Sequence, residues 1–509
     1  MVSEEKRRNR VLASESVAPL VLALDIGTSS VRAALYDAEA REVEGFEARV
    51  ERGLTVTAEG GSELEFEKGI RDVYAAIDAL FLRQPVPPHP IVAVGISAFW
   101  HSLIGADSEM RAVTPVYGWA DTRAASEAAE LRQLPDSEVF YQRTGARFHP
   151  SYWPAKILWL RKAYPEQFES VRHWLSFSDL LLHRFCGSAL TSISMASGTG
   201  LLNRFSSEWD GELASTIGVP LKQLPEIDSG ISSPRFLVPA LASRWPQLSE
   251  AKWLPAIGDG AANNVGAGCI SNDRLALMIG TSGAMRVLFD GEPPAELRAG
   301  LWCYRLDNKH PVVGGALSDG GGLFAWMVQS LNVGGDRLVI EKQLAELRPD
   351  QHGLTVLPFW SGERSTGWHE DARGAVLGLR SHTRPIEIVR ASMEAVAYRF
   401  ALIADALSSF AMPTKIVASG GALNASRVWT QILADVMGRP VVLSNVNEAS
   451  SRGAAIFALR TIGVLSNLTG ADIDGDPQFY PDDDAHKVYK KALARQEEFY
   501  GQLIENRDK

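Results

Sequence analysis

Two stretches of this chain are near copies of each other: Leu22-Ala23-Leu24-Asp25-Ile26-Gly27-Thr28-Ser29 and Leu275-Ala276-Leu277-Met278-Ile279-Gly280-Thr281-Ser282. They begin at positions 22 and 275 of 509, so each half of the chain holds one copy. Each copy is an apolar run that ends in a Gly-Thr-Ser turn, and a second apolar run follows, at 31–36 and 284–289. Such runs are typical of buried strands, and the sequence therefore predicts the same hairpin twice.

The turn residues of both copies suit an anion. Glycine lets the backbone approach a ligand closely, and neighbouring hydroxyl and N–H groups then solvate its negative charge. One such turn alone also fits a purely geometric role, but its recurrence in both halves favours binding. Two facing turns would hold a polyphosphate from both sides. The predicted phosphate-binding residues are Gly27, Thr28, Ser29 and Ser30 in the first copy and Gly280, Thr281 and Ser282 in the second.

The two copies differ at one informative position, where Asp25 of the first becomes Met278 of the second. A carboxylate at the entrance of an anion site repels phosphate unless a cation lies between them. Mg²⁺ suits that position because it binds through few carboxylates together with water and phosphate oxygens. A turn-capping role for Asp25 is the alternative. Arg32 leaves the same hairpin and is a further candidate for phosphate contact, although an exposed strand arginine explains it equally well.

The composition indicates a folded globular protein, with 46% hydrophobic and 22% charged residues. The 51 basic and 61 acidic residues give a net charge of -10, which makes nucleic acid an unexpected partner. Three widely spaced cysteines, Cys186, Cys269 and Cys303, indicate neither a disulfide framework nor a metal cluster. No run approaches the roughly 18 apolar residues of a membrane span. We therefore expect a cytoplasmic protein without a membrane partner.

The position of the two hairpins predicts two domains, at 19–269 and 270–465. A loose tail at 1–18 would precede them, and a charged surface segment at 466–509, largely helical, would follow them.

Several elements are predicted from periodicity and from start and stop signals. Residues 91–96 are a further central strand, and 67–82 are a helix. The clearest helix begins at Pro385 and continues to Leu407 with apolar residues at three-four spacing, which places one stripe on the core. A strand at 415–418, a Gly-Gly turn and a helix at 426–437 follow. This order is typical of a parallel or mixed sheet with helices on its faces.

The segment Gly258-Asp259-Gly260 precedes the second hairpin. A carboxylate between two glycines, with no neighbouring side chain to obstruct a substrate, suits a general base that accepts a proton from an attacking hydroxyl. Phosphoryl transfer needs little more than positioning, charge neutralisation and one such acceptor. The alternative is that Gly-Asp-Gly simply forms a turn.

A second polar and aromatic cluster lies upstream, at Trp100-His101-Ser102 and Trp119-Ala120-Asp121-Thr122-Arg123. Planar apolar faces with fixed hydrogen-bonding groups are suited to polyols and sugars. The alternatives are a core tryptophan at Trp119 and an ordinary salt bridge between Asp121 and Arg123.

These motifs, in this order, resemble the FGGY family of carbohydrate kinases, which shares the ATPase core of actin, Hsp70 and hexokinase. The resemblance spans about residues 20 to 460 and is specific in combination. It implies an α/β fold of two ribonuclease-H-like domains with a catalytic cleft between them, sugar in the N-terminal domain and nucleotide on the C-terminal one. The matching stretches are 25–32, His101, 119–123, 258–260, 279–282, 362–364, 371–374 and 419–422.

The resemblance also implies roles for individual residues. ATP and Mg²⁺ would be the cofactors, with Asp25 and Asp259 holding Mg²⁺ through water and Asp259 acting as the catalytic base. The nucleotide would contact Gly315, Gly321, Gly420, Gly421, Ala422 and Asn424. The substrate would contact Trp100, His101, Trp119, Asp121, Arg123 and Asp259. The resemblance also makes a homodimer plausible.

Within the family, Trp-Ala-Asp-Thr-Arg, His101-Ser102 and the Thr144-Gly145 and His149-Pro150 pairs look most like gluconate kinases, which favours phosphorylation of D-gluconate to 6-phosphogluconate. A xylulose, ribulose or other polyol kinase is the alternative. A non-catalytic ATP-dependent clamp of the actin or Hsp70 kind is the alternative from another class. Two positions depart from the family pattern: Trp100 replaces a smaller methionine, and Ser318-Asp319 replaces paired asparagines.

Overall fold

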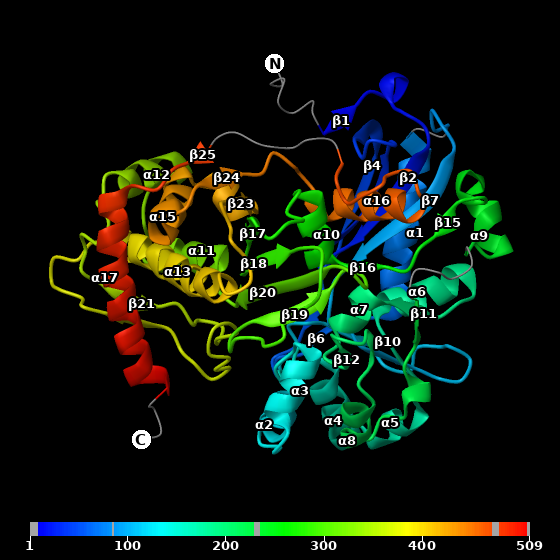
Figure 1. Cartoon of the computed structure of the whole chain (residues 1–509), viewed down its shortest axis with the longest axis horizontal. Coiled ribbons are helices and arrows are strands. Elements are labelled where there is room, and N and C mark those ends of the chain that lie inside the picture. Colours follow the sequence, from blue (N-terminus) through cyan, green and yellow to red (C-terminus); the bar gives the residue numbers. More distant parts are fainter. Residues whose placement is uncertain (1–8, 84–85, 229–234, 471–477, 506–509) are drawn as a thin grey trace.

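The computed structural model describes residues 9–83, 86–228, 235–470 and 478–505 (Figure 1). Two seven-stranded sheets form the centres of its two halves. Among the helices of these residues, none combines the length and apolar character that a bilayer crossing needs.

The first sheet has the order β1-β4-β3-β2-β7-β15, and β16 also pairs with β7. Strand β2 is antiparallel to β3, β3 is antiparallel to β4, and β2 is parallel to β7. The predicted hairpin is therefore β2–β3. The strands are β1 (Arg10–Val11), β2 (Leu20–Ile26), β3 (Ser30–Tyr36), β4 (Glu42–Glu51), β7 (Ile91–Ala98), β15 (Lys252–Trp253) and β16 (Ile257–Gly258).

The second sheet has the order β19-β20-β18-β17-β23-β24-β25. Strand β17 is antiparallel to β18, β18 is antiparallel to β20, and β17 is parallel to β23. This repeats the pattern of the first sheet, so the duplication seen in the sequence is a duplication of topology. The strands are β17 (Arg274–Ile279), β18 (Gly283–Leu288), β19 (Trp302–Arg305), β20 (Pro311–Leu317), β23 (Lys415–Ser419), β24 (Val441–Leu443) and β25 (Gln478–Phe479).

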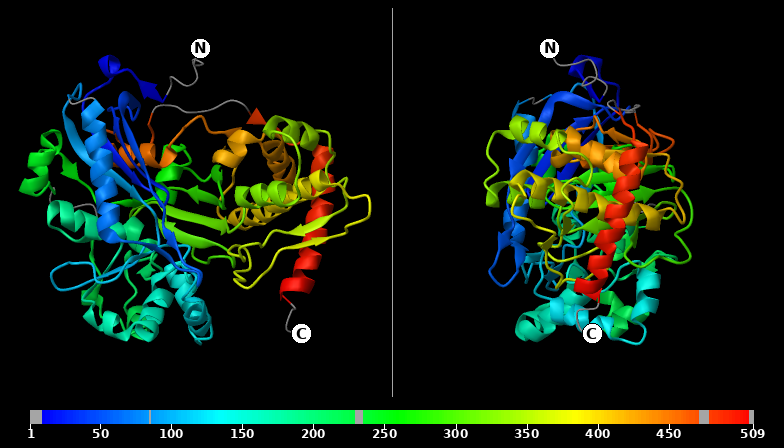
Figure 2. Two further views of the ribbon diagram at one scale, coloured as in Figure 1. Left: turned by 180° about the vertical axis from the view of Figure 1, so that it is seen from behind. Right: turned by 90° about the vertical axis from the view of Figure 1, so that its left-hand side faces the viewer.

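The predicted helices form close to the expected positions. Helix α1 (Phe66–Arg83) covers β3 and β4, as Figure 2 shows from behind. Helix α13 (Pro385–Leu407) packs its apolar stripe on β18 and β20, and α15 (Arg427–Met437) packs on α13. Three further helices of the second half are α11 (Gly321–Ser330), α12 (Arg337–Ala345) and α14 (Gly421–Ala425).

The chain between β7 and β15 adds a largely helical region below the first sheet in Figure 1. Its helices are α2 (Ala125–Arg132), α3 (Ser137–Thr144), α4 (Trp153–Ala163), α5 (Pro165–Ser170), α6 (Phe177–Cys186), α7 (Ile193–Ser197), α8 (Gly211–Thr216) and α9 (Pro239–Arg244). Short strands pair around these helices and at the edges: β5 (Thr55–Val56), β6 (Ser62–Leu64) and β9 (Val116–Tyr117); β8 (Ile104–Ala106) with β10 (His173–Leu175); β11 (Leu190–Ser192) with β14 (Glu226–Asp228); β12 (Leu202–Asn203) with β13 (Glu208–Trp209); and, in the second half, β21 (Thr355–Leu357) with β22 (Ala375–Leu377).

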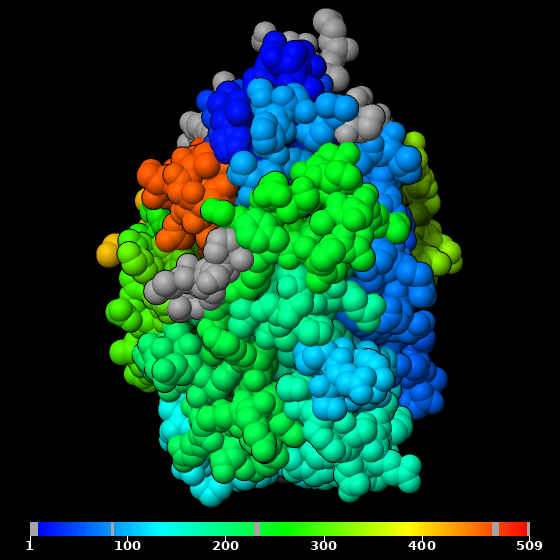
Figure 3. Space-filling model, turned by 90° about the vertical axis from the view of Figure 1, so that its right-hand side faces the viewer, coloured from blue at the N-terminus to red at the C-terminus, as the bar shows by residue number. Residues whose placement is uncertain are grey.

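Helix α16 (Ala449–Thr461) belongs to the second half in sequence but packs on β2 and β7 of the first sheet. Its Ala454, Ile456 and Leu459 side chains are buried in the first hydrophobic core. In Figure 3 the orange residues of this region accordingly lie against the blue N-terminal segments. Helix α16 lies within the domain predicted at 270–465, whereas its packing partners β2 and β7 lie in the domain predicted at 19–269.

Helices α16 and α10 (Asp259–Gly266) touch backbone to backbone. A β-carbon at Gly453 would lie 1.8 Å from the carbonyl oxygen of Ala262, and one at Gly266 would lie 1.8 Å from that of Ala449. Only glycine fits at these two contacts, since such distances are far below van der Waals separation. The contact fixes α10, and with it the backbone of Asp259.

Both ends of the chain are better integrated than the sequence predicts. The loose tail was expected to reach residue 18, but Arg10–Val11 pairs with β4, while residues 1–8 lie outside the described ones. The C-terminal segment forms α17 (Asp483–Tyr500), which exposes one face and buries Tyr489, Gln496 and Tyr500 with the other.

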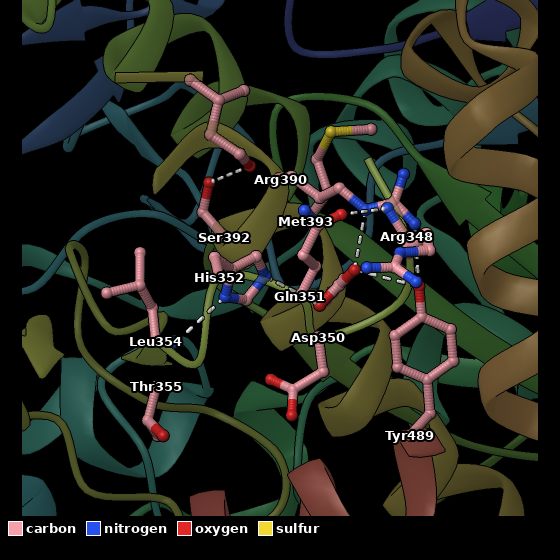
Figure 4. Close-up of polar contacts among 12 residues, drawn as sticks. Arg348, Asp350, Gln351, His352, Leu354, Thr355, Arg390, Ser392, Met393 and Tyr489 are labelled. Atoms are coloured by element: carbon pink, nitrogen blue, oxygen red, sulfur yellow. Dashed lines mark hydrogen bonds and ion pairs between the residues drawn. The ribbon is translucent and has the colours of Figure 1, made fainter. Parts of the chain in front are cut away.

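A buried polar network attaches α17 to α13. Glu394 accepts hydrogen bonds from Arg390 Nε (2.9 Å) and the Tyr489 hydroxyl (2.9 Å), and its other oxygen lies 3.1 Å from His352 Nε2. Figure 4 shows His352, Arg390 and Tyr489 around this centre. Burial raises the pKa of Glu394, but the hydrogen bond and charge of His352, followed by those of Arg390, keep this pKa below its usual range.

We predict that Gly453→Ala destabilises the protein by about 2–3 kcal/mol, because the added methyl overlaps the Ala262 carbonyl and forces the two helices apart. The better helix propensity of alanine, worth at most about 1 kcal/mol, does not offset this. Urea denaturation measures the change. Gly334→Ala is the matched control, because nothing lies within 4 Å of its β-carbon position; equal stability of both variants would contradict the close helix contact.

Candidate active site

Asp25 and Asp259 lie at the ends of β2 and β16, two strands that both pair with β7. Asp25 on β2 is in register with Ser97 on β7, and Gly258, directly before Asp259, is in register with the next residue, Ala98. Burial raises the pKa of Asp25 to about 6, the Ser97 hydroxyl opposes this, and the negative charge of Asp259 adds to it. The two carboxylates are therefore close enough to repel each other.

The two glycines beside Asp259 make room for Trp100. A β-carbon at Gly258 would lie 1.9 Å from Trp100 Cε2, and one at Gly260 would lie 2.5 Å from its Cζ3. The indole Nε1 donates a hydrogen bond of 2.9 Å to the Ser194 carbonyl, which fixes the ring. Gly-Asp-Gly is thus not a simple turn: it joins β16 to α10, and Asp259 is the first residue of that helix.

Arg286 on β18 reaches Asp259 from the second half of the molecule. Its side chain is buried, and its Nη1 lies 2.8 Å from the position that a β-carbon on Gly260 would occupy. Burial raises the pKa of Asp259, and Arg286 is the largest influence that lowers it. Two guanidinium nitrogens of Arg286, Nε and Nη2, have no hydrogen-bond partner among the described residues.

The first Gly-Thr-Ser turn closes with a hydrogen bond of 3.0 Å from the Gly27 N–H to the Ser30 carbonyl. Arg52 Nε donates to the Gly27 carbonyl at 3.0 Å, which fixes the peptide orientation. Thr28 is half-buried and Ser29 is exposed, so the turn is open to a ligand.

Arg32, the other candidate on this hairpin, is held by acids. Its Nη2 donates to Glu42 at 2.6 Å, and its Nη1 lies 3.4 Å from Glu448, at the start of α16. It lines a cavity of about 1210 Å³ between β1, β3, β4 and residues 445–452. These contacts tie the first hairpin to the chain before α16, and a phosphate would have to compete with two carboxylates for Arg32.

The second turn gathers most of the predicted nucleotide residues. The N–H of Gly280 donates to the Ser282 carbonyl at 2.9 Å, and the N–H groups of Gly320 and Gly322 both donate to the Thr281 carbonyl at 3.0 Å. A β-carbon on Gly321 would lie 3.0 Å from that of Ala422, and one on Gly420 would lie 2.4 Å from the carbonyl oxygen of Ile279. Gly421 and Asn424 are exposed beside them on α14.

Two further positions predicted near the nucleotide, Gly315 and Asp319, make contacts with the protein itself. Gly315 is buried in β20, where a β-carbon would meet Ile403 of α13 at 2.9 Å, so it faces the core. Asp319, which departs from the family pattern, accepts hydrogen bonds from the Ser361 N–H (2.8 Å) and hydroxyl (3.0 Å). Two hydrogen bonds from Ser361 therefore stabilise the carboxylate of Asp319 within the protein.

The predicted sugar cluster centres on His101. Its Nδ1 donates to the Gly198 carbonyl at 2.5 Å, which leaves Nε2 as an acceptor. Burial lowers its pKa to about 3, so the ring is neutral. Its ring lies 5.0 Å from that of Tyr152 and 6.4 Å from that of Trp100. A neutral acceptor among aromatic faces is suited to a sugar hydroxyl.

Asp121 and Arg123 form an ion pair. Arg123 Nη2 lies 2.6 Å from Asp121 and 2.6 Å from Glu63, and its guanidinium stacks 4.5 Å from the Trp159 ring centroid. Asp121 also accepts from the Ser62 N–H at 3.1 Å. The structure thus matches the salt-bridge alternative for this pair, while Trp119 is half-buried and remains partly open.

Arg286 is the main site residue that sequence reasoning missed. A signal existed, because the first hairpin carries Arg32 three positions after Ser29 and the second carries Arg286 four positions after Ser282. Comparison of the two copies beyond their turns would have singled it out.

Two carboxylate groupings are candidates for a metal. Asp350, His352 and Glu394 lie within 4.8 Å of one another, but Arg495 and Arg390 already pair with their carboxylates. Asp25 and Asp259 are better suited to a divalent cation than the group at Asp350. The two carboxylates repel each other, and a cation bound between them would relieve this repulsion.

The comparisons with known proteins agree with this geometry. The model of the N-terminal domain of the FGGY family of carbohydrate kinases matches residues 20–257, and that of the C-terminal domain matches residues 275–462. The gluconokinase of Bacillus subtilis is 27% identical over 93% of this chain and 94% of its own length. The xylulose kinase of Escherichia coli is 25% identical over 95% and 99%.

Solved structures show the same fold. Gluconate kinase from Lactobacillus acidophilus superposes with a TM-score of 0.86 at 26% identity, covering 95% of this chain and 98% of the other. The predicted fold of two ribonuclease-H-like domains and the predicted carbohydrate kinase activity with ATP are thereby confirmed. Since the two family models together cover most of its length, the chain belongs to the FGGY family of carbohydrate kinases.

Proposed function

We propose that this kinase phosphorylates D-gluconate to 6-phosphogluconate, with Asp259 as the general base. The sugar motifs favour gluconate, and two relatives named gluconokinase, from Bacillus subtilis and Bacillus licheniformis, support it at 27% and 26% identity. A xylulose, ribulose or other polyol substrate is the alternative, supported by the xylulose kinase of Escherichia coli. The predicted cytoplasmic location and homodimer stay predictions.

The observation that carries the mechanism is the placement of Asp259. Asp259 starts α10, and its carboxylate interacts electrostatically with Asp25 of the first hairpin and with Arg286 of the second. Asp259 accepts the proton of the substrate hydroxyl as that oxygen attacks phosphorus. Arg286 favours the ionised form of Asp259 and lies where negative charge gathers during transfer.

The two turns would hold ATP phosphates through backbone N–H groups and hydroxyls, and residues 420–424 would contact the nucleotide. Asp25 and Asp259 would hold Mg²⁺ through water, and this ion neutralises phosphate charge. Closure of the two halves would exclude water, which otherwise competes with the sugar hydroxyl.

We predict that Asp259→Asn folds and binds ATP but loses at least ~10²-fold in kcat, because asparagine cannot accept the proton. Steady-state kinetics measures turnover, and calorimetry measures ATP binding. Asp290→Asn, at an exposed acid after the second hairpin, is the control and should keep wild-type turnover. Unchanged turnover in Asp259→Asn would exclude the base role.

We predict that Arg286→Met shifts the acidic limb of the kcat/KM profile to higher pH. Asp259 acts in its ionised form, burial raises its pKa and Arg286 lowers it, so loss of the cation raises the pKa further. Arg286→Lys keeps the charge and should shift the limb less. A limb that does not move in Arg286→Met would show that Arg286 does not act on Asp259.

A substrate panel tests the proposed function itself. We expect gluconate to give the highest kcat/KM among gluconate, xylulose, ribulose, fuculose, glycerol and erythritol, measured as ADP release in a coupled assay. A higher value for a neutral polyol would replace gluconate by that substrate. ADP release that none of the panel stimulates would favour the non-catalytic clamp.

A further inference from the structure

The loop at residues 362–370 comes from the C-terminal half and lies against the sugar cluster of the N-terminal half. The Trp368 ring lies 5.5 Å from that of His149, and Glu370 pairs with Arg132 at 2.7 Å. The Arg364 guanidinium lies 5.6 Å from the centroid of the Trp119 ring. The second half of the molecule thus contributes an arginine to the pocket assigned to sugar.

The guanidinium of Arg364 is incompletely satisfied. Its Nε is buried and has no hydrogen-bond partner among the described residues, and no acid of that part of the chain forms an ion pair with it. An arginine keeps its charge in proteins, so a negatively charged acceptor would match this half-buried group. A buried donor left unpaired lowers stability, which a bound anion would relieve.

The other cations around the cluster are already engaged. Arg123 pairs with Asp121 and Glu63, and Arg132 pairs with Glu370. Lys156 Nζ donates to the carbonyls of Ser151 and His101, and burial lowers its pKa to about 7. Unlike Arg123 and Arg132, Arg364 forms no ion pair with an acid of the described residues.

A row of uncharged rings leads from Trp100, which packs beside Asp259, to His149, which packs against Trp368 of the Arg364 loop. The Trp100, His101, Tyr152 and His149 rings follow one another at centroid distances of 6.4, 5.0 and 6.4 Å. The Tyr152 and Tyr304 hydroxyls lie 2.5 Å apart. A substrate along this row would have hydroxyl partners in its middle, a base at one end and a cation at the other.

We propose that Arg364 binds the carboxylate of an aldonic acid substrate and thereby determines the preference for such acids over neutral polyols. This proposal rests on the proposed gluconate kinase function. It places the charged substrate contact on Arg364 and not on Arg123, the arginine that the sequence predicts as a substrate contact, because Arg123 already pairs with Asp121 and Glu63. The Nε–Nη edge of a guanidinium matches two carboxylate oxygens, and Trp119 supports its plane. Arg364 acts in binding, whereas the reacting hydroxyl is at the Asp259 end.

The test compares gluconate with glucitol, which has the same carbon chain but no carboxylate. For Arg364→Met we expect KM for gluconate to rise roughly 10- to 100-fold with little change in kcat, since a charged hydrogen bond of the ground state is lost. The kinetic constants for glucitol should stay nearly unchanged. Calorimetric binding of gluconate should weaken by the same factor as KM rises.

Two further variants complete the design. Arg364→Lys keeps the positive charge but lacks the paired N–H donors of a guanidinium, and it should give an intermediate KM for gluconate. Arg373→Met, on the same segment, removes an exposed arginine that bonds only backbone carbonyls, and should change neither substrate. If Arg364→Met does not fold, Arg364→Lys decides: wild-type KM for gluconate in that variant would overturn the proposal.

The outcomes separate this inference from the function on which it rests. A wild-type preference for gluconate over glucitol that survives in Arg364→Met overturns the role of Arg364 and leaves the gluconate kinase standing. A wild-type enzyme that shows no such preference overturns the proposed substrate. Loss of activity on both substrates in Arg364→Met, with ADP binding intact, overturns carboxylate recognition in favour of a general role.

Discussion

The indole of Trp100 packs so tightly on Gly258 and Gly260 that a β-carbon at either position would overlap it. This contact holds the backbone on both sides of Asp259, and the glycine contact between α10 and α16 holds the helix that follows. The carboxylate is therefore positioned by close packing and not by long flexible side chains. Precise placement of a proton acceptor is what phosphoryl transfer chiefly asks of a protein.

The charges of the site are divided between the two halves. Asp25 and Asp259 come from the N-terminal half, where burial raises the pKa of both. The cations that face this half, Arg286 and Arg364, come from the C-terminal half. The largest influence that lowers the pKa of Asp259 thus comes from the opposite half, so the electrostatic environment of this carboxylate is complete only when the two halves are apposed.

Local patterns predicted much of this architecture. The hairpins β2–β3 and β17–β18, the long helix α13 and the unit from β23 to α15 all formed where apolar periodicity and turn residues indicated. The motif order also led to the right family. These features depend on neighbouring residues, and that is why a single sequence shows them.

What the sequence did not show depends on contacts between distant segments. Arg123 looked available for substrate, but Glu63 and Asp121 neutralise it, and nothing near Arg123 in sequence points to Glu63. Gly315 looked like a nucleotide glycine, but Ile403 packs on it. Arg364 lies far along the chain from the rings that it faces. Whether an arginine is paired is a property of the tertiary fold.

Helix α16 has a consequence for how the chain can be divided. This helix lies near the C-terminal end of the sequence, yet it covers the apolar face of β2 and β7. A fragment that stops near residue 269 would leave that face in water, and a fragment that starts there would carry an apolar helix with no sheet to cover. The first half therefore completes its core with a helix that is encoded after the whole second hairpin, and a cut between the two hairpins would separate that helix from its sheet.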